Sequence, residues 1–293
     1  MCFQRWIIII VVMLSFYSFG ICEEFKLAYT NDSTSIVTSS LIQAVMVEKL
    51  NSSVKMAAYP PDQLWDAVAT GKADAMVSAW LPQSHAAMLK KHKGQVEILK
   101  PVTLGVKIGF VTPTYVTIDT LDQLSSKLSR FKNEVYCIKD HTGSIEMTKR
   151  AIAAYGLKNL KCVVLPEQAL INKIEACEKK LDWIMLGIWS PHIIFSQFKI
   201  KFLDDPKGVF SKDEQIVAVS KASLSKEDRD AYAILKKFYC SPKELQEIMG
   251  SILKNNKTPY GAAKDYVNKN PEQVKKWIVN VKKGHQKRRL NLK

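Results

Sequence analysis

Short apolar runs alternate with segments of helical periodicity along most of the chain. The run FKLAYT (25–30) predicts a strand, and residues 35–50 place apolar side chains at the spacing of an amphipathic helix. VKMAAY (54–59), DQLWDAVATG (62–71) and ADAMVSAW (73–80) continue the series as strand, helix and strand. Strands that alternate with helices favour an α/β fold with a mainly parallel sheet and crossover helices.

A second cycle of the same kind begins near residue 120 and predicts a second α/β unit. Two extended runs, GVKIGFVTPTYV (105–116) and EQIVAVSK (214–221), separate it from the rest, so we expect two crossings near 108–115 and 205–217. The remaining sequence is helical and is expected to return to the first unit. The predicted division is a signal peptide at 1–22, a first lobe at 23–110 and 212–293, and a second lobe at 111–211.

The N-terminus reads as a targeting segment. Arg5 precedes a mostly apolar run that is short for a membrane span and has the length of the core of a secretory signal. We expect cleavage before Glu23 and a periplasmic or extracytoplasmic mature chain. A retained membrane anchor and a lipoprotein attached through Cys22 are the alternatives; Ile21 stands where a lipoprotein signal has a small residue.

The distribution of charge bears on whether the protein binds nucleic acid. The net charge is +15 among 293 residues, but the basic residues concentrate only in the tail 281–293, and no nucleic-acid motif accompanies them. We therefore expect no nucleic-acid partner.

Four cysteines follow the signal segment, at positions 137, 162, 177 and 240, and their spacing fits no zinc site. Cys137 and Cys162 lie on predicted strands, so either one disulfide joins them or the thiols are unpaired.

Two tryptophans end predicted strands in separate units. Trp80 stands in AWLPQSH and Trp189 in GIWSPH, and each is followed by a proline two residues later and by a nearby histidine. Ligands of α/β folds bind beyond the carboxyl ends of strands, so both indoles are expected in the cleft between the lobes. Indole faces attract cations, quaternary ammonium groups among them. Trp65, Trp183 and Trp277 lie at apolar positions inside elements and are assigned to the core.

The loop KDHTGSIEMT (139–148) has the chemistry to bind an anion. It joins a strand to a helix through Thr142-Gly143-Ser144, and backbone N–H groups at a helix start favour negative charge. Gly143 lets the backbone approach a ligand closely. A carboxylate would suit this loop, and His85 could donate a further hydrogen bond to it.

With these segments in view, the sequence resembles the glycine betaine substrate-binding proteins of ABC transporters, the OpuAC type. The resemblance rests on LWDAVATGKADAMVSAWLPQSH, on GIWSPHIIF with KFLDDPKGVF, and on GVKIGFVTPTYV, and it covers about 25–280. It implies a two-lobed type II binding-protein fold with a two-strand hinge, a tryptophan cage for the ammonium group, and backbone amides for the carboxylate. Carried over by motif, Trp80 and Trp189 are cage walls, His85 is a carboxylate donor, and Gly143 and Ser144 offer their amides.

The resemblance also implies the function and the partners. We expect an ABC permease as the membrane partner, a quaternary amine such as glycine betaine, proline betaine or choline as the ligand, no cofactor or metal, and a monomer. The sequence contains no nucleophile elbow, metal-ligand helix or nucleotide loop that would favour an enzyme. A secreted sensor or adhesin of the same fold, or a binding protein for a less methylated amine, remains the alternative.

Two segments depart from the family pattern. YTNDSTSI has Asp32 where related proteins carry a third cage tryptophan, and the loop DHTGSI lacks the family's proline and first glycine. Asp32 either faces the cationic ligand, or a hydroxyl as in choline, or caps the helix that begins near Ser33. The missing aromatic face could come from an aromatic residue elsewhere, and the candidates are Tyr29, Phe110 and Tyr115.

Overall fold

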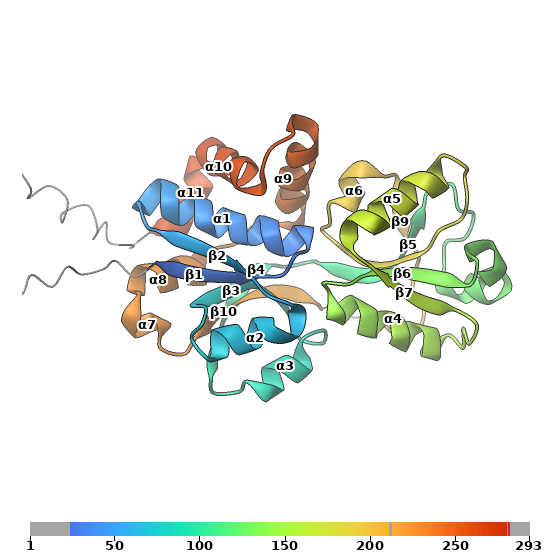
Figure 1. The fold of residues 1–293 in the computed structure, drawn as a ribbon, viewed down its shortest axis with the longest axis horizontal. Helices are drawn as coiled ribbons and strands as arrows, with labels where there is room; N and C mark the ends of the chain where they lie inside the picture. The colour runs from blue at the N-terminus through green and yellow to red at the C-terminus, as the bar shows by residue number, and fades with distance from the viewer. Residues whose placement is uncertain (1–23, 211–212, 280, 282–293) are drawn as a thin grey trace, which may run out of the picture.

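The chain folds into two lobes, each built on a five-stranded sheet with helices packed against both faces (Figure 1). A computed structural model describes residues 24–210, 213–279 and 281. The predicted signal peptide, and the basic tail apart from its first residue, lie outside the described residues. The predicted two-lobed α/β fold is confirmed.

The first lobe contains the sheet β2-β1-β3-β10-β4. Strands β1, β2 and β3 are parallel, whereas β10 is antiparallel to both β3 and β4. Its strands are β1 (Phe25–Tyr29), β2 (Val54–Ala58), β3 (Ala75–Leu81), β4 (Val96–Thr103) and β10 (Gln215–Lys221). Its helices are α1 (Ser33–Leu50), α2 (Pro61–Ala69), α3 (Ala86–Lys91), α7 (Leu224–Glu227), α8 (Arg229–Lys237), α9 (Pro242–Asn255), α10 (Pro259–Lys269) and α11 (Pro271–Ile278).

The second lobe repeats this plan with the sheet β7-β6-β8-β5-β9. Strands β6, β7 and β8 are parallel, and β5 is antiparallel to both β8 and β9. Its strands are β5 (Lys107–Pro113), β6 (Glu134–Ile138), β7 (Lys161–Leu165), β8 (Leu186–Ser190) and β9 (Ile200–Phe202). Its helices are the 3₁₀ helices η1 (Leu121–Ser126) and η2 (Leu128–Phe131) and the α-helices α4 (Thr142–Ala154), α5 (Glu167–Glu178) and α6 (Ile194–Gln197).

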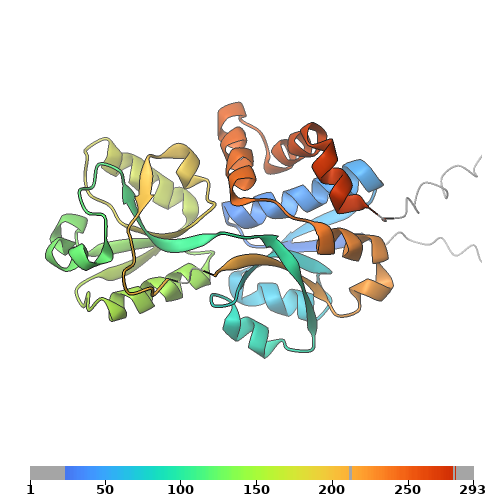
Figure 2. The same ribbon diagram turned by 180° about the vertical axis from the view of Figure 1, so that it is seen from behind.

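The chain passes between the lobes twice, once from β4 to β5 and once from β9 to β10 (Figure 2). All of β5 pairs within the second sheet, so the first crossing lies just before Lys107 and the predicted boundary at residue 110 falls inside that strand. Helices α9 and α10 return to pack on α1 in the first lobe, as predicted. These two connections between the lobes are the segments about which the lobes can hinge.

Capping side chains decide several helix boundaries. Asp32 accepts a hydrogen bond from the Ser35 backbone N–H and begins α1, and Asn51 in the left-handed region ends it. In the C-terminal region predicted to be helical, α7 and α8 are separate helices, because the Asp228 side chain accepts from the Ala231 N–H and starts a new helix. None of the described helices combines the length and the apolar character that a membrane crossing requires.

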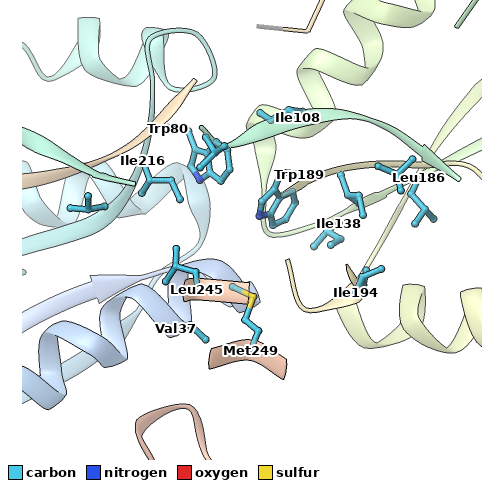
Figure 3. Packing of buried hydrophobic residues seen from close by; sticks show 14 of the residues in the cluster. Val37, Trp80, Ile108, Ile138, Leu186, Trp189, Ile194, Ile216, Leu245 and Met249 are labelled. Carbon is cyan, nitrogen blue, oxygen red and sulfur yellow. The ribbon is translucent and has the colours of Figure 1, made fainter. Parts of the chain in front are cut away.

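The apolar core runs through both lobes and across their junction. Trp65, Trp183 and Trp277 are buried within it, as predicted. Cys137 on β6 and Cys162 on β7 bring their sulfurs to 3.3 Å, and all four cysteines of the described chain are free thiols. At the junction, Trp80 and Trp189 lie side by side among aliphatic side chains of both lobes (Figure 3).

Candidate functional site

The two tryptophans singled out in the sequence meet where the lobes touch. Trp80 is the penultimate residue of β3 in the first lobe, and Trp189 is the penultimate residue of β8 in the second. Their ring centroids are 6.2 Å apart at an interplanar angle of 74°, and the residues are 2% and 0% exposed. Each tryptophan precedes a cis peptide bond to proline, Leu81–Pro82 in one lobe and Ser190–Pro191 in the other. The mirrored strand ends thus form one aromatic contact between the lobes.

The side chain of His141, which was not predicted from the sequence, completes the cluster. Its ring stacks on Trp189 at a centroid distance of 3.9 Å and meets Trp80 edge to face at 5.0 Å. His141 is the N-cap of α4, and its Nδ1 accepts a hydrogen bond of 3.0 Å from the Ser144 N–H. A histidine at a helix start is no signal of ligand contact in a single sequence, so nothing in the pattern distinguished this ring.

Two of the three aromatic residues proposed as a third cage wall, Phe110 and Tyr115, make contacts elsewhere. Phe110 packs against Phe210 at a centroid distance of 5.4 Å. The Tyr115 hydroxyl donates to the Asp182 carbonyl at 2.7 Å. The ring that joins the two tryptophans is therefore a histidine.

His85 supports the end of β3. Its Nδ1 accepts hydrogen bonds from the Trp80 backbone N–H at 3.1 Å and from the Trp65 indole at 3.3 Å. Burial lowers the pKa of His85 to about 4, so the ring is neutral at pH 7. Because Nδ1 accepts, the neutral ring carries its proton on Nε2, and Nε2–H is the group that His85 can offer to an acceptor.

The start of α4 comes up against the turn that follows Trp80. Gly143 lies so close to Ser84 that a Cβ on the glycine would stand 2.6 Å from the Ser84 Cβ. The Ser144 amide is held by His141 Nδ1, and the Ser144 hydroxyl donates to the His141 carbonyl at 3.0 Å. Of the two amides predicted to meet a carboxylate, the structure therefore places Ser144 in a cap and Gly143 at the contact between the lobes.

Asp32 is engaged on both carboxylate oxygens. Oδ1 accepts from the Ser35 N–H at 2.9 Å and Oδ2 accepts from the Thr30 hydroxyl at 2.5 Å. Burial raises the pKa of Asp32 to about 6, because it outweighs the two hydrogen bonds, which act to lower the pKa. The helix-capping role considered in the sequence analysis is therefore the one that the hydrogen bonds display.

A second set of contacts joins the start of α1 to the end of β8. The Trp189 indole Nε1–H donates to the Thr34 hydroxyl at 2.9 Å, and this hydroxyl donates to the Pro191 carbonyl at 2.7 Å. The Ser33 N–H donates to the Glu167 carboxylate at 3.1 Å, and His192 Nε2 lies 3.4 Å from the same carboxylate oxygen. These bonds link the lobes directly beside the tryptophan pair.

The electrostatics around Glu167 fit its position between the lobes. Burial acts to raise the pKa of its carboxyl group, but the His192 ring and the bonds from Ser33 outweigh it and lower the pKa. The carboxylate therefore stays ionised and accepts from the N-terminal turn of α1, where the helix dipole favours negative charge.

The described surface also carries a groove of about 720 Å³ at another edge of the junction. It is lined by α5, α6 and α9, with Glu178, Phe198 and Leu253 among its residues. The groove contains neither tryptophan of the pair. Among the described residues, no three His, Cys, Asp or Glu side chains are grouped so that they could hold a metal ion.

Comparison with known proteins identifies the family. Residues 23–269 match the OpuAC family, described as the substrate-binding domain of ABC-type glycine betaine transport systems. The chain belongs to this family. It is accordingly a substrate-binding protein rather than an enzyme.

Individual relatives agree with the assignment. A glycine betaine/carnitine transport binding protein from Listeria monocytogenes is 30% identical over 143 residues, which are 48% of this chain and 47% of the relative. The chain therefore aligns with about half the length of this curated relative. Lactococcal OpuAC, solved closed with glycine betaine, has a TM-score of 0.81 at 30% identity over 87% of this chain and 99% of its own. The glycine betaine/L-proline-binding protein ProX from Borrelia burgdorferi has a TM-score of 0.80 at 29% identity, with coverages of 87% and 97%.

Proposed function

We propose that this OpuAC-family protein is the extracytoplasmic binding component of an ABC importer and closes around a small quaternary ammonium compound. The observation that carries the proposal is the contact between Trp80 and Trp189 from opposite lobes. A ligand held between two such rings is released only when the lobes separate, which suits delivery to a membrane permease. Family membership and the likeness to a glycine betaine complex support the same ligand class.

Cation–π attraction is the physical basis of the proposed cage. A quaternary ammonium group has no N–H to donate, so recognition depends on the negative face of aromatic rings. Each indole contributes on the order of 0.5–2 kcal/mol, more when the pair is desolvated. Together with hydrogen bonds to an anionic end of the ligand, these contacts could support micromolar binding, which corresponds to about 8 kcal/mol.

Within this class we propose a betaine rather than choline as the preferred ligand. Both oxygens of Asp32 already accept hydrogen bonds, one from the Thr30 hydroxyl and one from the Ser35 N–H. The carboxylate is therefore engaged within the first lobe and is a poor partner for a ligand hydroxyl. The start of α4 instead leaves the Thr142 hydroxyl and His141 Nε2 without a hydrogen-bond partner in the described structure, and both can donate to a carboxylate. A thermal-shift panel of glycine betaine, proline betaine, carnitine, choline and dimethylglycine tests the order, with the largest rise in melting temperature expected for a betaine.

Calorimetry on tryptophan variants tests the cage. Trp80→Ala and Trp189→Ala are each expected to weaken binding of glycine betaine more than tenfold, because each removes one indole face from the cation. Trp183→Ala is the control, since Trp183 is a buried indole of the second lobe that packs on Phe131 instead. Binding by both junction variants that matched the wild type would refute the cage.

A further inference from the structure

His141 has a buried polar atom that the fold leaves without a partner. Its Nδ1 is used to cap α4, but within the described structure Nε2 has no hydrogen-bond partner, although the residue is only 4% exposed. The ring carrying Nε2 is held between Trp80 and Trp189. The unused atom therefore lies at the place where the proposed ligand would bind.

The protonation state of His141 makes this atom a donor. Burial, together with the nearby rings of His85 and His192, lowers the pKa of His141 well below its usual value, so the ring is neutral at pH 7. Nδ1 must be the unprotonated nitrogen because it accepts from the Ser144 N–H. The proton is then on Nε2, and a buried N–H without an acceptor destabilises the folded state.

The surroundings of His141 show which kind of acceptor would relieve that cost. Two further buried side-chain oxygens without a hydrogen-bond partner in the described structure, Ser84 Oγ and Thr142 Oγ1, flank the start of α4. Ser84 lies against Gly143, the residue between Thr142 and the capped Ser144. Hydroxyl groups can donate as His141 Nε2–H does, so the three groups suit an acceptor-only partner such as a carboxylate.

We propose that His141 is a specificity-determining residue, and that its Nε2–H donates to the carboxylate of a zwitterionic quaternary ammonium ligand. The assignment rests on the function proposed above and extends it to the anionic end of the ligand. Stacking on Trp189 and the hydrogen bond from Ser144 fix the ring, so the donor is positioned before the ligand arrives. His141 thereby selects betaines over amino alcohols such as choline.

The variant His141→Asn separates this role from the structural one. Asparagine is a good N-cap whose side-chain oxygen can still accept from the Ser144 N–H, but it removes the ring and Nε2–H. We expect glycine betaine to bind at least tenfold more weakly, while choline, which has no carboxylate, loses less than threefold. His92→Asn is the matched control, because His92 is also buried beside an indole, that of Trp65, and its Nε2 lies 3.0 Å from the Asp66 carboxylate, away from the tryptophan pair.

The remaining outcomes are each decisive. Unchanged binding of glycine betaine, or an equal loss for both ligands, would overturn the donor role. Tighter binding would overturn it too, since the imidazole would then be competing with the ligand for Trp189. Nitrogen NMR of the His141 ring gives an independent readout, with a shift of the Nε2–H resonance expected on adding glycine betaine but not choline. A wild-type chain that bound no quaternary amine would refute the proposed function itself.

Discussion

Burial of single ionisable residues couples the site to pH. The pKa of Asp32 is raised to about 6, so the folded state binds its proton more tightly than the unfolded state, and acidification through pH 6 favours folding through this group. The pKa of His85 is lowered to about 4, so acidification below about 6.5 favours the unfolded state through this group. The two buried groups therefore oppose each other between pH 4 and 6.

Asp32→Asn tests this opposition. Asparagine can still accept from the Ser35 N–H through its side-chain oxygen and can donate its amide N–H to the Thr30 hydroxyl, so the variant should fold. At pH 7 it should be more stable by up to about 3 kcal/mol, because no buried charge remains. As the pH falls to 4 this gain should vanish, and the free energy of unfolding should fall more steeply than in the wild type. Urea denaturation at each pH measures it, and Asp62→Asn, at an exposed site in the first turn of α2, is the control.

The same variant decides the role of Asp32 toward ligand. A residue that only caps α1 leaves the affinity for glycine betaine and choline within about twofold when Asn replaces it, since Asn caps as well as Asp. A larger loss for either ligand would show that the carboxylate faces the binding site.

At the scale of elements, local patterns predicted most strands and helices but not those whose existence depends on neighbours. The strand ends at Trp80 and Trp189 were found because a buried strand followed by proline is a local signal. Strand β4 was not predicted, because it contains Pro101 and proline usually argues against a strand. β4 lies at the edge of its sheet, where one side has no neighbouring strand and a missing N–H donor is tolerated. The orientation of His141 likewise follows from packing on Trp189, which is 48 residues away in the sequence.

Gly143→Ala tests the meeting of α4 with the turn at Ser84. Alanine in the first turn of α4 leaves the second lobe stable or slightly more stable, by up to about 1 kcal/mol. Its Cβ would however stand 2.6 Å from the Ser84 Cβ, so the lobes could not close fully. We expect an unchanged or higher melting temperature without ligand and a much smaller rise on adding glycine betaine. A rise equal to that of the wild type would show that closure does not require this contact.

At the scale of the whole molecule, the sequence predicted two lobes, two crossings and a cleft, because each unit repeats the strand and helix rhythm. It could not predict which groups join across the cleft. The Thr34 hydroxyl and the Trp189 indole are 155 residues apart, and Ser33 and Glu167 are 134 apart. Single polar residues at helix starts carry no mark of such partners, so the contacts that close the lobes emerge only from the folded chain.

Thr34→Val tests whether those contacts hold the ligand. Valine keeps the shape of the side chain but removes the acceptor of the Trp189 Nε1–H and the donor to the Pro191 carbonyl. The two buried hydrogen bonds lost between the lobes, at about 1 kcal/mol each, lower the stability of the closed state by about 2 kcal/mol, which is about a thirtyfold effect. Since closure follows ligand encounter, the loss should appear as a faster dissociation rate with little change in the association rate.

Stopped-flow tryptophan fluorescence with glycine betaine measures both rates. Thr38→Val is the matched control, because the Thr38 hydroxyl, one turn further along α1, donates at 2.8 Å to the Thr34 carbonyl within the same helix. It should leave both rates unchanged, since no bond between the lobes is lost. If Thr34→Val instead slowed association and left dissociation unaltered, the hydrogen bonds would act on the open protein, and the start of α1 would guide ligand entry rather than hold the lobes closed.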